Sequence, residues 1–174
     1  MRWDYFDFDK SLWHVPAKRE EIKGVRYSYR GMKMKEEHIV LLSRQIMILF
    51  EQLKQISCDK ELLFPRDHDA TKVMSENTVN STLRAMGYDT KTEVCGHGFR
   101  TMVRSALSES VLWSDDVIER QLSRAKRNSI RSAYIPTSEL LDERRLMEQW
   151  WADYLNANKK YMLHLMIMLS RTSL

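Results

Sequence analysis

Between residues 97 and 107 the sequence reads His97-Gly98-Phe99-Arg100-Thr101-Met102-Val103-Arg104-Ser105-Ala106-Leu107. Its apolar residues recur three and four positions apart, which predicts a helix with one broad apolar face turned toward a core. His97 and Arg100 are three positions apart, so a helix would bring both side chains to one side of its first turn. The stretch therefore predicts a core helix with a polar site beside it.

The first 42 residues look like strands, and helices dominate from Ser43 onward. A polar turn is expected at residues 7–10, and a three-stranded antiparallel sheet from residues 11–15, 26–29 and 38–42, with residues 32–37 at a hairpin tip. A loop is expected at 64–67, and further helices from Ser43, from Ser75 to Gly87, and from Ser114, Asn128 and Ser138. The sequence thus predicts an α+β fold, mainly α, in which a small sheet is followed by a helical bundle.

The composition limits the class of protein. A chain of 174 residues can form one domain with a sizeable core but not two, and 43% hydrophobic residues are typical of globular proteins. The net charge of +4 allows an anionic partner without requiring one. Cys58 and Cys95 lack metal-ligand spacing, so no metal site or disulfide scaffold is expected. The charged residues after Met1 and the lack of a long apolar run predict a cytoplasmic protein with no signal peptide or membrane span.

Three short segments are informative through their order and spacing: Met32-Lys33-Met34-Lys35-Glu36-Glu37-His38-Ile39-Val40-Leu41-Leu42-Ser43, then His97-Gly98-Phe99-Arg100, then Val117-Ile118-Glu119-Arg120-Gln121-Leu122 with Arg127-Asn128 and Arg131-Ser132-Ala133-Tyr134. Together they resemble the catalytic domain of tyrosine recombinases, most closely the integrases of satellite phages and genomic islands. Residues 1–8 and 143–155 resemble the flanking segments of that domain. The resemblance covers residues 1–156 as a partial catalytic domain, and residues 157–174 are expected to form a C-terminal tail helix.

The resemblance implies phosphoryl transfer without a metal or other cofactor, with Tyr134 as the nucleophile that forms a 3′-phosphotyrosyl link to DNA. Arg100 would bind two nonbridging phosphate oxygens with its planar fork and stabilise the charge of the transition state. His97 would donate a hydrogen bond or act as a general base toward the phenol, whose ordinary pKa is about 10. Lys33 would be the general acid for the 5′-oxygen leaving group, or Lys35 if the hairpin register differs by two residues.

Two features depart from the family pattern. Arg124 occupies the place of the family's second histidine or tryptophan, and an arginine can donate a hydrogen bond to phosphate but cannot act as an acid or base. The family's first catalytic arginine belongs upstream of the segment that begins here at Met1. We therefore expect the chain to be a fragment that cleaves DNA weakly or not at all by itself.

The expected partner is double-stranded DNA carrying an attachment site. A basic run of Arg124, Lys126, Arg127 and Arg131 lies between Leu122 and Tyr134 and predicts phosphate contacts, although such a run is also typical of a solvated face. The resemblance further implies a homotetramer in the synaptic complex, a nucleoid-associated location and a role for host DNA-bending factors.

Two other interpretations stay open at the level of sequence. The chain could be a DNA-binding remnant of an integrase that has lost its chemistry, or an unrelated helical interaction module. Taken singly, Tyr134 resembles a packing residue, His97 a helix-start histidine and Lys33 a solvated turn lysine. The recombinase interpretation depends on the ordered set of motifs rather than on any one of them.

Overall fold

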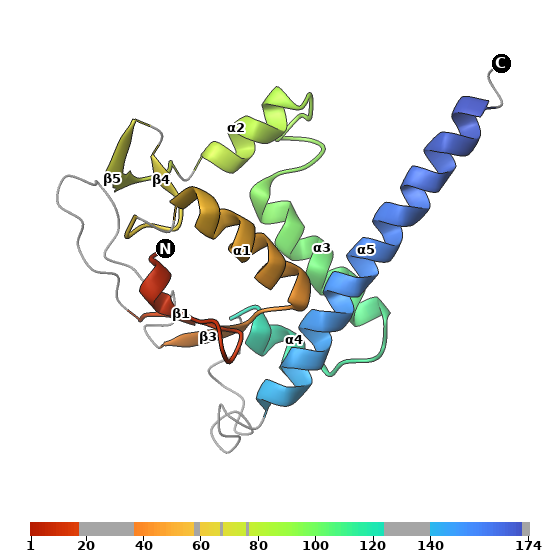
Figure 1. The fold of residues 1–174 in the computed structure, drawn as a ribbon. Helices are drawn as coiled ribbons and strands as arrows, with labels where there is room; N and C mark the ends of the chain where they lie inside the picture. The colour runs from red at the N-terminus through yellow and green to blue at the C-terminus, as the bar shows by residue number, and fades with distance from the viewer. Residues whose placement is uncertain (18–36, 58–59, 67, 76, 124–139, 172–174) are drawn as a thin grey trace.

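The computed structural model describes residues 1–17, 37–57, 60–66, 68–75, 77–123 and 140–171 (Figure 1). A short 3-10 helix, η1, spans Trp3–Tyr5, and the strands are β1 (Phe6–Asp7), β2 (Leu12–Val15), β3 (His38–Leu41), β4 (Pro65–Arg66) and β5 (Asp69–Val73). The helices are α1 (Arg44–Ser57), α2 (Thr78–Ala85), α3 (Gly96–Glu109), α4 (Asp115–Gln121) and α5 (Leu141–Arg171). The predicted fold class, α+β with the sheet first and mainly helical, is confirmed.

The first three strands form one antiparallel sheet in the order β1-β2-β3. Trp13 in the middle strand pairs with Phe6 on one side and Val40 on the other. The backbone N–H of Lys10 donates to Asp7 Oδ1 at 2.9 Å, which closes the expected turn between β1 and β2. A strand at Phe6–Asp7 was not predicted, and the strand expected at 26–29 lies outside the described residues.

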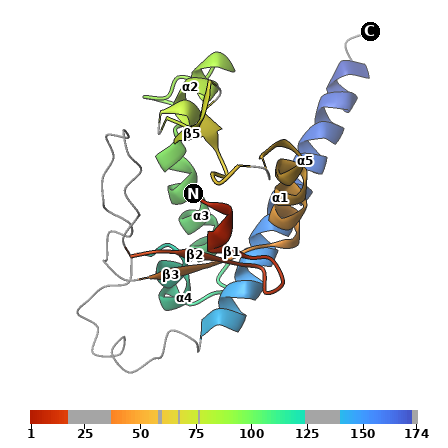
Figure 2. The ribbon, with the colours of Figure 1, turned by 60° about the vertical axis from the view of Figure 1, so that its left-hand side comes forward.

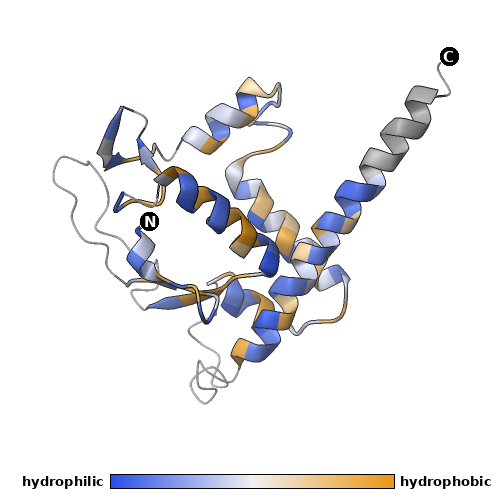
Figure 3. Ribbon diagram, viewed as in Figure 1, coloured by the Kyte–Doolittle hydropathy of each residue, from blue (hydrophilic) through white to orange (hydrophobic). Residues whose placement is uncertain are grey.

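An aromatic cluster holds α1 against this sheet. Phe6 stacks on Trp13 with ring centroids 5.7 Å apart, and Phe50 of α1 meets Phe6 edge-on at 4.9 Å. Leu42 and Leu63 are buried in the same cluster. In Figure 3 apolar and polar residues alternate along α1, as expected for a helix with one face on a core.

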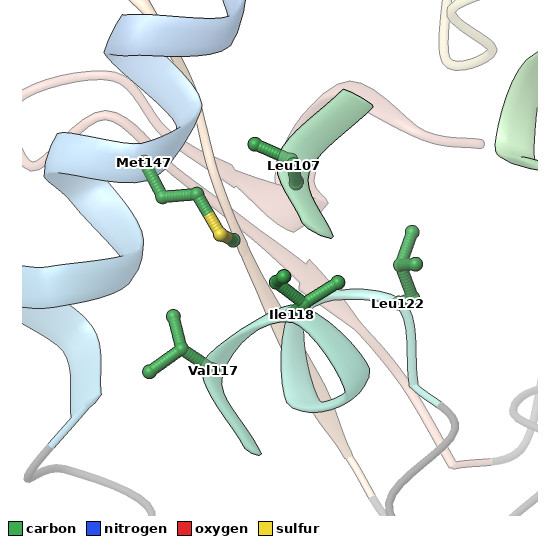
Figure 4. Close-up of a cluster of buried hydrophobic side chains, with 5 residues drawn as sticks. All are labelled: Leu107, Val117, Ile118, Leu122 and Met147. Carbon is green, nitrogen blue, oxygen red and sulfur yellow. The ribbon is translucent and has the colours of Figure 1, made fainter. Parts of the chain in front are cut away.

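A second cluster joins α3, α4 and α5. Its buried members are Leu107, Val117, Ile118, Leu122 and Met147, and in Figure 4 the side chain of Met147 reaches from α5 toward those of the other two helices. Val103 and Trp151 pack against it from outside. This cluster sets the position of α3, the helix that begins with His97 and Arg100.

Removal of Met147 from the second cluster tests this packing. Met147 is 0% exposed and Leu146, beside it on α5, is 65% exposed. Met147→Ala should lower the free energy of unfolding by about 2–5 kcal/mol, because the substitution leaves a cavity. The control Leu146→Ala should change it by less than about 0.5 kcal/mol. Urea unfolding followed by tryptophan fluorescence measures both, and equal losses would contradict the burial of Met147.

The predicted starts of two helices are confirmed, since α1 begins after Ser43 and α4 after Ser114. The N–H of Ile46 donates to Ser43 Oγ at 3.4 Å, as expected of a capping serine. Gly87, with a φ of +97°, follows the end of α2. The helix expected from Asn128 and the residue Ser138 lie outside the described residues.

Two local predictions were wrong. The expected loop at 64–67 contains β4, where Pro65 pairs with Val73 of β5 in an irregular two-stranded sheet; proline is tolerated there because each strand of such a sheet has a free edge. The apolar face of α3 is only partly buried, since Leu107 is 0% exposed but Phe99 is 43% and Met102 49% exposed. The width of an apolar stripe does not by itself show how much of the stripe is covered.

The last helix is the longest element. The C-terminal half of α5 projects beyond the other elements in both views (Figures 1 and 2), and the side chains of residues 153–161 are exposed. No helix in the described part of the chain is both long and apolar enough to cross a membrane.

Candidate active site

The first two turns of α3 carry the two predicted site residues that the structure describes. The N–H of Gly96 donates to Asn80 Oδ1 of α2 at 2.9 Å, which fixes where α3 begins. His97 is exposed and Arg100 is half-buried, one turn apart on this helix. This placement leaves the imidazole accessible and sets the guanidinium closer to the protein interior.

Arg100 also acts electrostatically on a residue of β3. The pKa of His38, the first residue of β3, is lowered in part by the positive charge of Arg100, so the two side chains are within electrostatic reach of each other. The N-terminal part of α3 and the start of the strand that follows the predicted lysine hairpin are therefore within electrostatic reach of each other.

The other predicted site residues lie outside the described residues: Tyr134, Lys33, Lys35, Arg124, Lys126, Arg127 and Arg131. Their roles therefore stay predictions. The described chain stops at Ser123, directly before Arg124, and resumes at Leu140.

A polar cluster around one buried arginine, not predicted from the sequence, lies within electrostatic reach of Arg100. We call it the Arg144 cluster: Arg144, Gln121, His38 and Glu148. Arg144 of α5 is 1% exposed; its Nε donates to Gln121 Oε1 at 2.8 Å and its Nη2 to the backbone carbonyl of Ile39. His38 Nε2 lies 3.2 Å from the backbone carbonyl of Gln121. Because a carbonyl only accepts hydrogen bonds, Nε2 of His38 carries the proton.

The electrostatics of the cluster follow from its burial. Burial lowers the pKa of His38, and the charges of Arg144 and Arg100 lower it further, so this imidazole is neutral at pH 7. Burial also lowers the pKa of Arg144 to about 10, so Arg144 keeps its charge at neutral pH. Burial raises the pKa of Glu148 to about 7, against the opposing effects of the Arg144 charge and a hydrogen bond with Gln121. Glu148 is thus the group of the cluster that titrates near pH 7.

The shifted pKa of Glu148 predicts how stability depends on pH. The folded protein keeps a proton on Glu148 up to about pH 7, whereas the unfolded chain releases it near the ordinary value of 4.5, so this group makes the protein less stable as the pH rises from 5 to 8. His38 acts in the opposite direction, because its folded pKa lies below its ordinary value of 6.5.

The parent should therefore lose unfolding free energy between pH 5 and pH 8, and Glu148→Gln should remove about 1–2 kcal/mol of that loss. This is less than the full pKa shift implies, because the side chain is only partly buried. Urea unfolding of both proteins at the two pH values measures this difference. An unchanged pH dependence in the variant would contradict the buried placement of Glu148.

A hydrogen-bonded ion pair joins α3 to α4. Arg104, one turn after Arg100, donates from Nε to Glu119 Oε1 at 2.6 Å. This hydrogen bond and the ion pair with Glu119 raise the pKa of Arg104. Arg104 is therefore engaged with α4, which makes it a useful control for Arg100.

Comparisons with known proteins identify the family. The model of the phage integrase family matches residues 1–140. The chain is 81% identical over 166 residues to the integrase of Enterobacteria phage P4, covering 95% of this chain and 38% of that protein. It is 57% identical over 159 residues to the putative protein IntB of Escherichia coli K12, covering 91% and 40% of the two chains. It is 35% identical over 156 residues to the prophage integrase IntA of the same organism, covering 90% and 34%.

These relatives are longer than the chain, which spans about two-fifths of the length of the P4 integrase and of IntB. No solved structure matches the chain. The family model includes the segments of His97, Arg100 and Tyr134, and it also includes β3 and α4. The chain therefore belongs to the phage integrase family of tyrosine recombinases.

Proposed function

We propose that the chain is the DNA-cleaving part of a site-specific recombinase that integrates or excises a phage or genomic island. The observation that carries the proposal is the family match over residues 1–140, together with His97 and Arg100 in the first two turns of α3, where Arg100 is within electrostatic reach of β3. The relatives named as integrases in a phage and in a prophage support the same class of reaction.

The proposed reaction begins with the Tyr134 oxygen, which attacks the phosphorus of the scissile phosphate as its proton passes to His97. Arg100 binds the nonbridging oxygens, where negative charge grows in the transition state. The bond from phosphorus to the 5′-oxygen breaks, and Lys33, or Lys35, gives that oxygen a proton. A 5′-hydroxyl of the partner strand reverses these steps, so the phosphotyrosyl link conserves the bond for rejoining.

The charges of the described residues suit an anionic substrate at this place. The positive charges of Arg144 and Arg100 both lie within electrostatic reach of His38, whose pKa they lower. Arg104 is paired with Glu119 and is directed to α4. Arg100 stands in the His97-Gly98-Phe99-Arg100 segment that matches the family motif, so we assign Arg100 to the phosphate and give Arg104 a structural role.

The proposed substrate is duplex DNA that carries an attachment site. Four protomers of the protein are proposed to bind it as a tetramer, with host DNA-bending factors as further partners. The basic run of Arg124, Lys126, Arg127 and Arg131 is proposed to contact phosphates, which makes binding weaker as salt rises. Arg124 is proposed to donate a hydrogen bond to the scissile phosphate in place of the family's second histidine.

Covalent capture tests the proposal. We would place this chain in the P4 integrase instead of the region that it matches, a protein called here the P4 chimera. A duplex with the P4 attachment site is nicked just 3′ of the scissile phosphate, so that the short 5′-hydroxyl strand diffuses away after cleavage. We expect a denaturant-resistant complex in which the protein is linked to the 3′-phosphate end.

Three outcomes separate the interpretations. A complex on the 3′-phosphate end supports the recombinase. Binding of the attachment site without any covalent complex would indicate a DNA-binding remnant, and failure to bind DNA would contradict the proposal. The chain alone should form the complex far more slowly than the P4 chimera, because it corresponds to only 38% of the P4 integrase.

A further inference from the structure

We propose that Arg144 is a positioning residue of the recombination site, which holds β3 and the end of α4 together beside Arg100. The inference rests on the proposed function, and it concerns the Arg144 cluster rather than the residues that touch DNA.

Arg144 joins two elements that are far apart in the sequence. Its guanidinium donates to the side chain of Gln121, the last residue of α4, and to the backbone carbonyl of Ile39 in β3. α5 packs against both elements, as Figures 1 and 2 also show. A planar guanidinium with donors on several sides can hold two acceptors in a fixed relation, which lysine cannot do as well.

Gln121 is held from a second side by His38. The Nε2–H of His38 donates to the Gln121 backbone carbonyl at 3.2 Å. This carbonyl belongs to the last turn of α4, where backbone acceptors lack partners within the helix. Gln121 is therefore bound through its side chain from α5 and through its backbone from β3, and both ties must break if the end of α4 moves.

The segments that continue from these two elements carry the proposed chemistry. His38 begins β3 three residues after Lys35, and Gln121 ends α4 three residues before Arg124 on the way to Tyr134. The Arg144 cluster thus holds the two described elements, β3 and α4, from which these segments continue in the sequence. It does so within electrostatic reach of Arg100, since the charges of both arginines lower the pKa of His38.

Stability alone does not account for a charge at position 144. Arg144 lies three residues before Met147, whose side chain is in the second apolar cluster. Burying a guanidinium carries a large desolvation cost, and replacing a buried ionic group by an apolar one of similar volume is often neutral or stabilising. An arginine here is better explained by the fixed geometry of its two bonds than by added stability.

The test compares single-turnover cleavage with DNA binding in the P4 chimera. We expect Arg144→Gln and Gln121→Leu each to slow covalent-complex formation at saturating protein by about tenfold or more, because a misplaced group costs rate rather than affinity. The Kd for attachment-site DNA should change by less than about threefold. Gln121→Glu, which keeps an acceptor oxygen for Arg144, should lose clearly less activity than Gln121→Leu.

Two matched controls come from α5. Arg145 is exposed and donates to the Lys10 carbonyl at 3.0 Å, so Arg145→Gln should leave both rate and Kd unchanged. Met147→Ala lowers stability without touching the hydrogen bonds of the cluster, and all assays are run at a temperature where thermal melts show every variant folded. If Met147→Ala slows cleavage as much as Arg144→Gln does, the role of Arg144 is structural only and the inference is overturned.

The remaining outcomes are also distinct. Cleavage at the parent rate by Arg144→Gln, with the unsubstituted P4 chimera active, would overturn the inference alone. No covalent complex with the unsubstituted P4 chimera would overturn the proposed function, and this inference with it. Slower cleavage at unchanged Kd in Arg144→Gln, with both controls active, supports the positioning role.

Discussion

The Tyr134→Phe variant of the P4 chimera is expected to form no detectable covalent complex with nicked attachment-site DNA. The substitution removes one oxygen, the atom proposed to attack phosphorus, and leaves the ring in place. Loss of a nucleophile that works together with its neighbours lowers the rate by at least about 10⁴-fold. The Kd for the same DNA should change by less than about twofold, because the phenol is not proposed to provide binding energy.

The matched control is Tyr161→Phe. Tyr161 is 63% exposed on the projecting half of α5, so the loss of its hydroxyl should leave the cleavage rate unchanged. A covalent complex formed at the parent rate by Tyr134→Phe would show that another residue is the nucleophile, and the carry-over from the family motif to position 134 would be wrong.

Arg100→Ala is expected to lower the single-turnover cleavage rate by about 10³-fold, because the transition state loses a two-pronged donor to the nonbridging oxygens. Arg100→Lys keeps the charge but not the fork, and should lose less than Arg100→Ala. Binding should weaken only modestly in both variants, since one phosphate contact among many is removed. Rapid-quench kinetics with excess protein separates the rate from the Kd.

The control for Arg100 lies one turn further along the same helix. Arg104→Ala removes the contact with Glu119 and should leave the cleavage rate within about threefold of the parent. A second readout needs no DNA. The pKa of His38, followed by NMR, should rise in Arg100→Ala, because the Arg100 charge lowers it in the parent. An equal loss of cleavage in Arg100→Ala and Arg104→Ala would contradict the assignment of Arg100 to the phosphate.

The fold was predictable where a local pattern determines the structure. Ser43 marks a helix start through its capping hydrogen bond, Ser114 directly precedes α4, and the apolar run at 38–42 corresponds to β3, so these elements were correctly predicted. The pair β4–β5 was missed because a two-residue strand with Pro65 has no readable alternation. The exposure of Phe99 and Met102 depends on which elements pack against α3, and periodicity carries no information about that.

The candidate site divides in the same way. His97 and Arg100 were found because they are neighbours in one motif, and the structure places them in the first two turns of a helix. Arg144 was missed because its partners Gln121 and Ile39 are 23 and 105 residues away. One signal was available: Arg144 lies on the same helical face as Leu140 and Met147, where a long charged residue is usually assumed to extend to solvent.

The central claim is that Tyr134 becomes covalently attached to DNA. The most direct measurement is mass spectrometry of the captured complex of the P4 chimera, after digestion of the protein with protease and of the DNA with nuclease. We expect a single peptide that carries a nucleotide 3′-phosphate on the oxygen of Tyr134. A nucleotide attached to any other residue would contradict this assignment of Tyr134. Cleaved DNA without any peptide that carries a nucleotide would contradict it as well.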